Sequence, residues 1–168
     1  MALLKNGKLL RDRWLVADTL EEALRPGAKL VSLELWQAER ETLRGLGAVG
    51  VILPNDADPE VLAGDLDRIA AVVLQFPAFA DGRAFSQARI LRDRHGYTGE
   101  IRAEGPLIAD QYGYLLRCGF DVVAVADDVN LDSWRKAASR FANVYQPAAD
   151  ARIPAYRQRH TAPVALAS

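Results

Sequence analysis

Between residues 28 and 145, short apolar runs alternate with amphipathic stretches. Five runs have the length and composition of buried strands, at residues 28–36, 48–54, 70–77, 99–105 and 121–127. Each run is followed by a stretch whose apolar residues have helical spacing, and the connections are short. Repeated strand–helix units with continuously apolar strands are typical of a parallel sheet covered by helices, so the pattern predicts an α/β fold.

The same pattern fits two architectures. About five βα units can form an incomplete TIM-like barrel or a flavodoxin-like open sheet, and hydrophobic periodicity does not separate the two. We favour the incomplete barrel, closed or covered by a partner chain, and we therefore expect a homo-oligomer.

The two ends of the chain differ from this middle. Asn6-Gly7 lies between apolar residues, which is a strong signal for a two-residue hairpin turn, so we expect a β-hairpin over about residues 1–18. Residues 1–145 would then form a single α/β domain. After Tyr145 the sequence loses its periodicity and is rich in alanine and proline, which predicts a mobile C-terminal tail over residues 146–168.

Composition narrows the classes of function. The chain has 168 residues, a formal net charge of −1 and a pI near 6.1, so we expect no general attraction to nucleic acid or to anionic membranes. The sequence shows no signal peptide and no membrane-spanning run, and we expect a cytoplasmic protein. The single cysteine, Cys118, excludes an internal disulfide and a cysteine-based zinc site. Because the glycine-rich fingerprints of nucleotide binding are also absent, we expect no cofactor and no metal.

One stretch carries more groups suited to binding an anion than a helix and a strand require. Residues 79–105 contain five arginines and four glycines. Ligands of parallel α/β folds bind beyond the carboxyl ends of the strands, where this chain places Asp81, Arg83 and Glu104. Asp81 can cap the helix expected over residues 83–95. Arg83, in the first turn of that helix, opposes the helix dipole and therefore needs either solvent or an anionic partner.

The strand at residues 99–105 is unusual because it alternates, with Glu100, Arg102 and Glu104 on one face. Either the strand lies at an edge or a barrel rim with this face in water, or the charged side chains line a polar interior site. We expect Asp81, Arg83, Arg102 and Glu104 to converge at the carboxyl ends of the strands. The candidate residues are Arg83, Arg102 and Gln111 for binding an anion, and Asp81 and Glu104 for acid–base chemistry.

Other polar residues in the region are expected to be structural. Arg89 and Arg92 flank the apolar stripe of the helix at 83–95, so we expect their side chains to lie along its surface. His95, before the glycine that ends this helix, suits the negative end of the helix dipole. Cys118, beside the helix-ending Gly119, is expected to be a small buried residue.

Residues 76–121 resemble a bacterial family known as domain of unknown function 934. The matching motifs are Phe-Pro-x-Phe-x-Asp-Gly-Arg at 76–83, Ser-x-Ala-Arg-x-Leu-Arg at 86–92, Gly-Glu-x-Arg-Ala at 99–103, Asp-Gln at 110–111 and Arg-Cys-Gly-Phe-Asp at 117–121. A weaker likeness extends over roughly residues 28–145. The chain departs from the family pattern at Pro106 and Ala109, so no role is carried over to those positions.

The resemblance implies a biological context. Members of the family are usually encoded beside assimilatory sulfite reductase and other proteins of sulfate assimilation, and they are often labelled oxidoreductases. The resemblance therefore implies an accessory protein of assimilatory sulfite reduction, with sulfite reductase or its electron donor as the partner and a small anion as a further ligand. Two alternatives stay open, which are an enzyme such as an oxidoreductase acting on a small anionic substrate and an oligomeric scaffold without catalysis.

Overall fold

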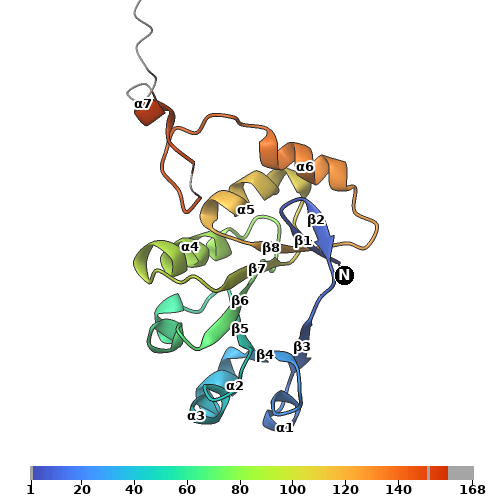
Figure 1. Ribbon diagram of the computed structural model, residues 1–168, viewed down its shortest axis with the longest axis vertical. Coiled ribbons are helices and arrows are strands. Elements are labelled where there is room, and N and C mark those ends of the chain that lie inside the picture. The colour runs from blue at the N-terminus through green and yellow to red at the C-terminus, as the bar shows by residue number, and fades with distance from the viewer. Residues whose placement is uncertain (1, 151, 159–168) are drawn as a thin grey trace, which may run out of the picture.

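The chain is built around one eight-stranded sheet that curls into half of a barrel (Figure 1). The computed structural model describes residues 2–150 and 152–158. The order of strands across the sheet is β2-β1-β8-β7-β6-β5-β4-β3. The strands are β1 (Ala2–Lys5), β2 (Lys8–Leu10), β3 (Trp14–Ala17), β4 (Ala28–Ser32), β5 (Val49–Leu53), β6 (Ile69–Gln75), β7 (Glu100–Glu104) and β8 (Val122–Val125).

Most of the sheet is parallel, as the sequence predicts. Strands β3 to β8 lie side by side in chain order with parallel pairing, while β1 pairs antiparallel with both β8 and β2. A flavodoxin-like sheet reverses its strand order at a switch point, and the unbroken order of β3 to β8 has no such reversal. The incomplete barrel is therefore the better description of this mixed, curled sheet.

The expected count of five strand–helix units is not confirmed. The N-terminal hairpin consists of β1 and β2 and ends at Leu10, whereas Trp14–Ala17 forms a further parallel strand beside β4. Residues 14–17 were expected within the hairpin of about residues 1–18, which the Asn6-Gly7 turn signal indicates. The polar residues 11–13 interrupt this segment, and Trp14 and Ala17 are buried once β3 has joined the opposite edge of the sheet.

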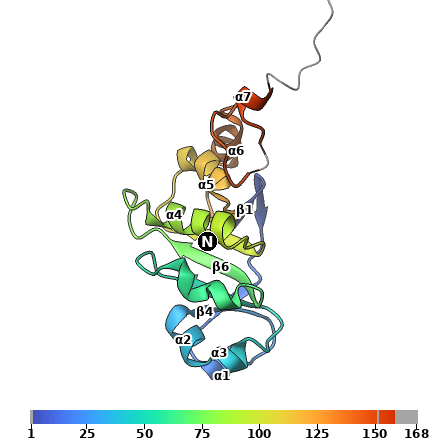
Figure 2. The ribbon, with the colours of Figure 1, turned by 90° about the vertical axis from the view of Figure 1, so that its left-hand side faces the viewer.

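Helices cover the outer, convex side of the sheet (Figures 1 and 2). The helix at 83–95 changes from an α-helix to a π-helix along its length, and the segment after Asp58 is a 3₁₀-helix. The helical elements are α1 (Leu20–Ala23), α2 (Leu33–Ala38), α3 (Arg40–Leu43), η1 (Pro59–Asp65), α4 (Arg83–Arg89), η2 (Ile90–Arg94), η3 (Ala109–Gln111), α5 (Tyr112–Cys118), α6 (Leu131–Ser139) and α7 (Ala155–Gln158).

Local capping explains where two elements end. The strand expected over 28–36 stops at Ser32, because the Ser32 hydroxyl accepts a hydrogen bond from the Leu35 N–H at 3.1 Å and starts α2. Gly119 ends α5 in the left-handed conformation with φ of 99°, which a residue without a side chain adopts at little cost.

The core has a large cluster on one face of the sheet and two small clusters on the other, one of which consists of Leu3, Val122 and Ala124. The large cluster lies between the sheet and the helices and includes Val72, Ile101 and Leu115. The other small cluster lies on the concave face and includes Trp14 and Val73. Because successive residues of a strand point to opposite faces, a side chain next to Ile101 in sequence points into the half-barrel.

The chain itself crosses the open side of the half-barrel. Strands β2 and β3 are the two edges of the sheet, yet residues 11–13 alone connect them. Four Cα steps separate Leu10 from Trp14, so the two edges approach within about 14 Å at this point. The concave face is therefore bordered by this connection as well as by strands.

The segment expected to be a mobile tail packs against α5 in its first part. The Ala149 N–H donates to the Arg117 carbonyl at 3.0 Å, and Asp150 pairs with the Arg117 guanidinium at 3.1 Å. Residues 159–168 of the expected tail lie outside the described residues. Within the described ranges, no helix combines the length and the hydropathy needed to cross a membrane.

Candidate functional site

A polar cluster lies beyond the carboxyl ends of β5 and β6. The Asp81 carboxylate accepts hydrogen bonds from the Arg83 N–H at 3.2 Å, from Arg83 Nε at 3.1 Å and from Arg83 Nη2 at 2.7 Å. The Asn55 side-chain amide also donates to it, at 2.7 Å. Asp81 thus accepts the N–H of the first residue of α4, but the N-cap residue of this helix is Gly82, not Asp81 as expected. Asp81 is also the anionic partner that Arg83 requires.

This pairing fixes the charge of Asp81. The Arg83 hydrogen bonds hold the pKa of the Asp81 carboxyl far below its ordinary value, and the same pair raises the pKa of the Arg83 guanidinium. A carboxylate that stays ionised through the neutral range is a poor general acid or base, because it does not exchange a proton near pH 7.

A second cluster lies on the concave face of the sheet, where Arg102 projects from β7. The strand is central, between β6 and β8, so the explanation of an edge strand does not apply. Arg102 is 5% exposed, and its two terminal nitrogens contact Asp12 at 2.8 Å and Glu104 at 2.7 Å. The charged face of this strand is therefore a polar interior, in which one buried cation lies between two carboxylates.

Glu104 lies at the mouth of this interior. Its side chain is 23% exposed and lines a hollow of about 490 Å³ at the carboxyl ends of β6 and β7, together with Gln75, Phe76, Pro77 and Gly105. Because Glu104 is paired with Arg102, it faces the hollow as part of an ion pair and not as a lone carboxylate.

Four of the five candidate residues are thus bonded in two pairs, Asp81 with Arg83 and Arg102 with Glu104. No hydrogen bond or ion pair between described residues joins the Asp81–Arg83 pair to the Arg102–Glu104 pair. The convergence of all four side chains on one ligand stays a prediction. Gln111 accepts a hydrogen bond from the Ile108 N–H at 3.1 Å and stabilises the start of η3.

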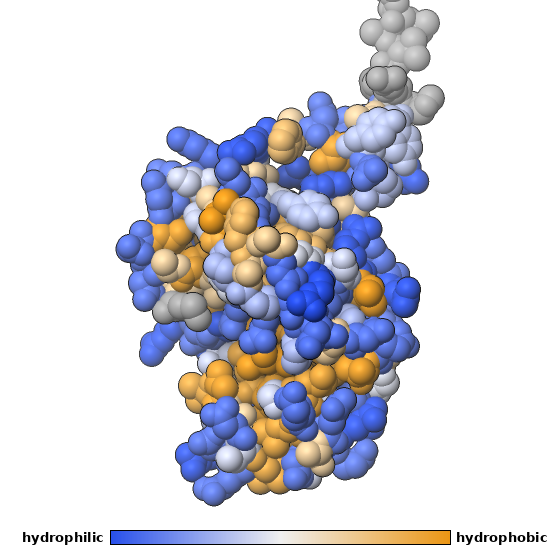
Figure 3. Space-filling model, turned by 180° about the vertical axis from the view of Figure 1, so that it is seen from behind, coloured by the Kyte–Doolittle hydropathy of each residue, from blue (hydrophilic) through white to orange (hydrophobic). Residues whose placement is uncertain are grey.

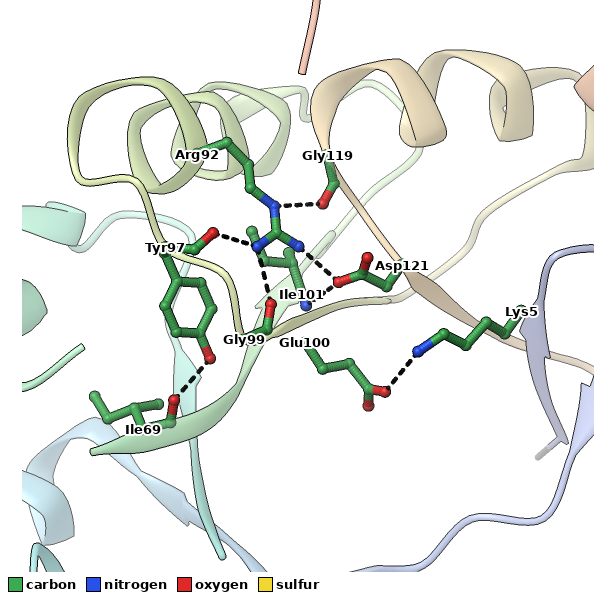
Figure 4. A network of polar contacts seen from close by, with 9 residues as sticks. All are labelled: Lys5, Ile69, Arg92, Tyr97, Gly99, Glu100, Ile101, Gly119 and Asp121. Carbon is green, nitrogen blue, oxygen red and sulfur yellow. Dashed lines mark hydrogen bonds and ion pairs between the residues drawn. The ribbon is translucent and has the colours of Figure 1, made fainter. Parts of the chain in front are cut away.

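Arg92 is an important residue whose role the sequence analysis missed (Figure 4). It was expected to lie along the helix surface, but its side chain is 15% exposed and bonds to three carbonyl oxygens. It donates to Gly119 at 3.0 Å, to Gly99 at 2.9 Å and to Tyr97. It also pairs with Asp121 at 2.6 Å, and Asp121 in turn accepts the Ile101 N–H at 2.8 Å. Arg92 thus joins the end of η2 to the starts of β7 and β8.

Two glycines make room for this network. A Cβ on Gly119 would lie 2.5 Å from Arg92 Cγ, and a Cβ on Gly99 would collide with the Tyr97 hydroxyl. The motif residues Arg92, Gly99, Gly119 and Asp121 therefore have a structural explanation at the amino ends of β7 and β8.

Three further polar side chains in this region are buried, those of Cys118, Tyr97 and Asp65. Cys118 is 3% exposed, which confirms the expectation of a small buried residue, and burial raises the pKa of its thiol. Burial also raises the pKa of Tyr97, whose hydroxyl donates to the Ile69 carbonyl at 3.0 Å. Asp65, which the sequence did not single out, is 1% exposed and pairs with Arg40 at 2.7 Å. The described residues contain no group of three or more side chains suited to holding a metal ion.

An aromatic groove forms a separate surface feature. We use this name for the hollow of about 410 Å³ between α5, α6, residues 140–146 and Arg152. Tyr114, Phe141 and Tyr145 line it and are 58%, 69% and 79% exposed. Arg117, Arg140 and Arg152 also line the groove. The groove was not predicted from the sequence, because its lining residues come from segments far apart in the chain, between Asp110 and Arg152.

The comparisons with known proteins agree with the resemblance found in the sequence. No curated protein matches the chain. Residues 50–156 match a family described as a bacterial protein of unknown function, DUF934, and this match contains all the motifs between residues 76 and 121. The match spans more than half of the chain, which therefore belongs to the DUF934 family.

Proposed function

We propose that this chain is a cytoplasmic accessory protein of assimilatory sulfite reduction that acts by binding sulfite reductase or its electron donor. The observation that carries the proposed binding role is the aromatic groove. The pathway rests on the family resemblance, because members of the family are usually encoded beside sulfite reductase.

The groove has the composition of a protein-binding surface. Aromatic and arginine side chains are enriched at protein interfaces and supply most of their energetic hot spots. Here three aromatic rings are more than half exposed around one hollow, and arginines lie beside them. Arg140 pairs with Asp110 at 2.9 Å, and Arg117 pairs with Asp150, so these arginines are held in place before a partner arrives.

The alternative of an enzyme acting on a small anion is less well supported. That mechanism needs arginines that are free to bind the substrate, but Arg83 and Arg102 are bonded to carboxylates of their own chain. An anion would have to displace Asp81 or Glu104 and overcome its charge. The low pKa of Asp81 also disfavours it as the acid–base group.

The exposed edge of the sheet supports self-association as part of the proposal. Apolar side chains gather over the lower half of the molecule in Figure 3, the part that contains β3 and β4. On the edge strand β3, Leu15 and Val16 are 56% and 62% exposed although they point to opposite faces. Unpaired edge strands with apolar side chains tend to pair with another chain, and we propose a second copy as that chain.

The binding role is tested with purified sulfite reductase holoenzyme and its electron donor. We expect the wild-type chain to bind one of them in a surface-binding assay, and the double variant Phe141→Ser/Tyr145→Ser to bind at least about tenfold more weakly. The matched control is Phe79→Ser, which removes a ring that is 59% exposed and does not line the groove, and which should leave binding unchanged.

Two outcomes would contradict parts of the proposal. Absence of binding to both proteins would overturn the proposed role in sulfite reduction. Binding that survives the double variant would show that the partner docks on a surface other than the groove.

A further inference from the structure

The geometry points to an anion-binding cavity inside the half-barrel, at the amino end of β7, whose ligand is a small organic anion. Its lining consists of Leu3, Lys5, Leu10, Arg11, Arg13, Trp14, Glu100 and Val122, and its volume is about 310 Å³. None of the cations that line it is among the anion-binding candidates of the sequence analysis. The inference does not depend on the proposed role in sulfite reduction.

The back wall of this cavity is apolar and rigid. Leu3, Trp14 and Val122 are 4%, 6% and 1% exposed, so they belong to the packed concave face of the sheet. A volume near 300 Å³ lies at the lower end of the range for small-molecule sites. An inorganic oxyanion would leave this wall in contact with water, whereas a ligand with an apolar body would cover it.

Positive charge is in excess at the cavity. Three cations, Lys5, Arg11 and Arg13, lie around a single carboxylate, that of Glu100. Lys5 Nζ lies 3.4 Å from Glu100 Oε2, a long contact that accounts for one cation (Figure 4). Within the described part of the chain, Arg11 and Arg13 make no ion pair. Arg13 instead lies over the Trp14 ring, 5.5 Å from its centre.

This arrangement contrasts with the arginines discussed above. Arg83, Arg92 and Arg102 are each bonded to a carboxylate of the chain. Two guanidinium groups without such a partner, beside a cavity, leave room for a carboxylate, sulfonate or phosphate group supplied by a ligand.

Asp12 anchors the backbone of the connection that carries the two arginines. One of its oxygens accepts the Trp14 N–H at 2.9 Å, and the other contacts Arg102 at 2.8 Å. Residues 11 and 13 flank this anchored position, so the ligand does not have to order the connection when it binds.

The test follows the indole N–H signals of the three tryptophans by ¹⁵N NMR, with benzenesulfonate and sulfate as probes. Trp14 lines the cavity, and the variant Trp14→Phe identifies its signal. We expect benzenesulfonate to shift this signal in a saturable manner and sulfate to bind at least about tenfold more weakly. The double variant Arg11→Gln/Arg13→Gln should raise the dissociation constant of benzenesulfonate by about tenfold or more.

The matched control is the double variant Arg25→Gln/Arg68→Gln. It removes the same charge from two exposed arginines that pair with Glu21 and Asp67, and it should leave binding unchanged. An unshifted Trp14 signal with both probes, or an equal loss of binding in the control, would overturn the site. Sulfate binding as tight as benzenesulfonate binding would overturn the ligand class. The proposed function is tested separately, by the binding of Phe141→Ser/Tyr145→Ser to sulfite reductase or its electron donor.

Discussion

Replacing Arg102 by methionine tests whether the buried cation on β7 holds the half-barrel together. Methionine retains most of the length of the side chain and removes the charge. In the wild type, the guanidinium lies 2.8 Å from Asp12 and 2.7 Å from Glu104. The first contact joins the connection between the two sheet edges to a central strand, and the second lies within that strand.

The expected cost follows from this geometry. At the effective dielectric constant of about 20 that suits such sites, two unit charges 4 Å apart attract by about 4 kcal/mol, and desolvation of the buried guanidinium offsets much of this gain. Removing one partner of a buried pair typically costs 3–5 kcal/mol, because a charge is left uncompensated. Asp12 and Glu104 keep side-chain exposures of 31% and 23%, so water can partly solvate them. We therefore expect about 3 kcal/mol, at the lower end of this range.

Urea denaturation followed by tryptophan fluorescence measures this change. The urea m-value should stay unchanged. In a thermal unfolding experiment, each kcal/mol lowers the midpoint of a chain of this size by about 2–4 °C, so the midpoint should fall by roughly 6–12 °C. Arg102→Lys keeps the charge but loses the two-sided contact, and it should cost about half as much. If Arg102→Met were as stable as the wild type, or more stable, the pair would not hold the fold. If sulfate stabilised the wild type and not this variant, Arg102 would bind the anion itself.

Three further predictions concern Gly119, Asp81 and Cys118. Gly119→Ala should lower the free energy of unfolding, measured by urea denaturation, by about 1–3 kcal/mol, because alanine is strained at positive φ and its Cβ would crowd Arg92. An unchanged urea midpoint would contradict the role of the Arg92 network. Asp81→Asn should lower the stability of the protein at pH 7, and this loss relative to the wild type should shrink as the pH falls below about 4. The reason is that a carboxyl whose pKa is lowered in the folded state loses its stabilising contribution when it is protonated. A difference in stability that does not depend on pH between 7 and 2 would refute the ion pair. Cys118 should react with a thiol reagent at pH 8 far more slowly in the native protein than in denaturant, since burial raises the pKa of its thiol, and equal rates would show that the site opens readily.

The strands and helices between residues 28 and 127 could be predicted because their signals are local. Apolar runs and helix-ending glycines such as Gly119 act within a few positions, whereas the Ser32 cap is equally local but was not anticipated. The partner of a strand is not local information. Residues 14–17 look like the end of a hairpin, and only the curl of the whole sheet brings them beside β4.

Contacts between residues far apart in sequence also explain why the roles of Asp12 and Arg92 were not predicted. Asp12 meets Arg102 across 90 positions of sequence, so nothing near residue 12 indicates a partner. Arg92 was assigned to the surface on the assumption of continuous α-helix. The π-helix at 90–94 closes its hydrogen bonds over five residues instead of four, and this changes the direction in which its side chains point. Arg92 lies within this π-helical segment and bonds to Gly119 and Asp121.

The distribution of paired and unpaired charges is the best guide to where this protein binds other molecules. Most charged residues of the motif region are bonded within the chain, and Arg92 and Asp121 bond to each other and to the backbone at the starts of β7 and β8. A motif that is satisfied internally identifies the family without identifying its ligand. Arg11 and Arg13 lie outside the segment that matches the family, and they combine exposure, proximity to a cavity and lack of an ion pair within the described part of the chain. An unpaired cation beside an apolar wall gains more from an incoming anion than a cation that must first release its own carboxylate. Ligand searches should therefore begin at residues 11–13 and at the aromatic groove, ahead of the arginines that dominate the sequence motif.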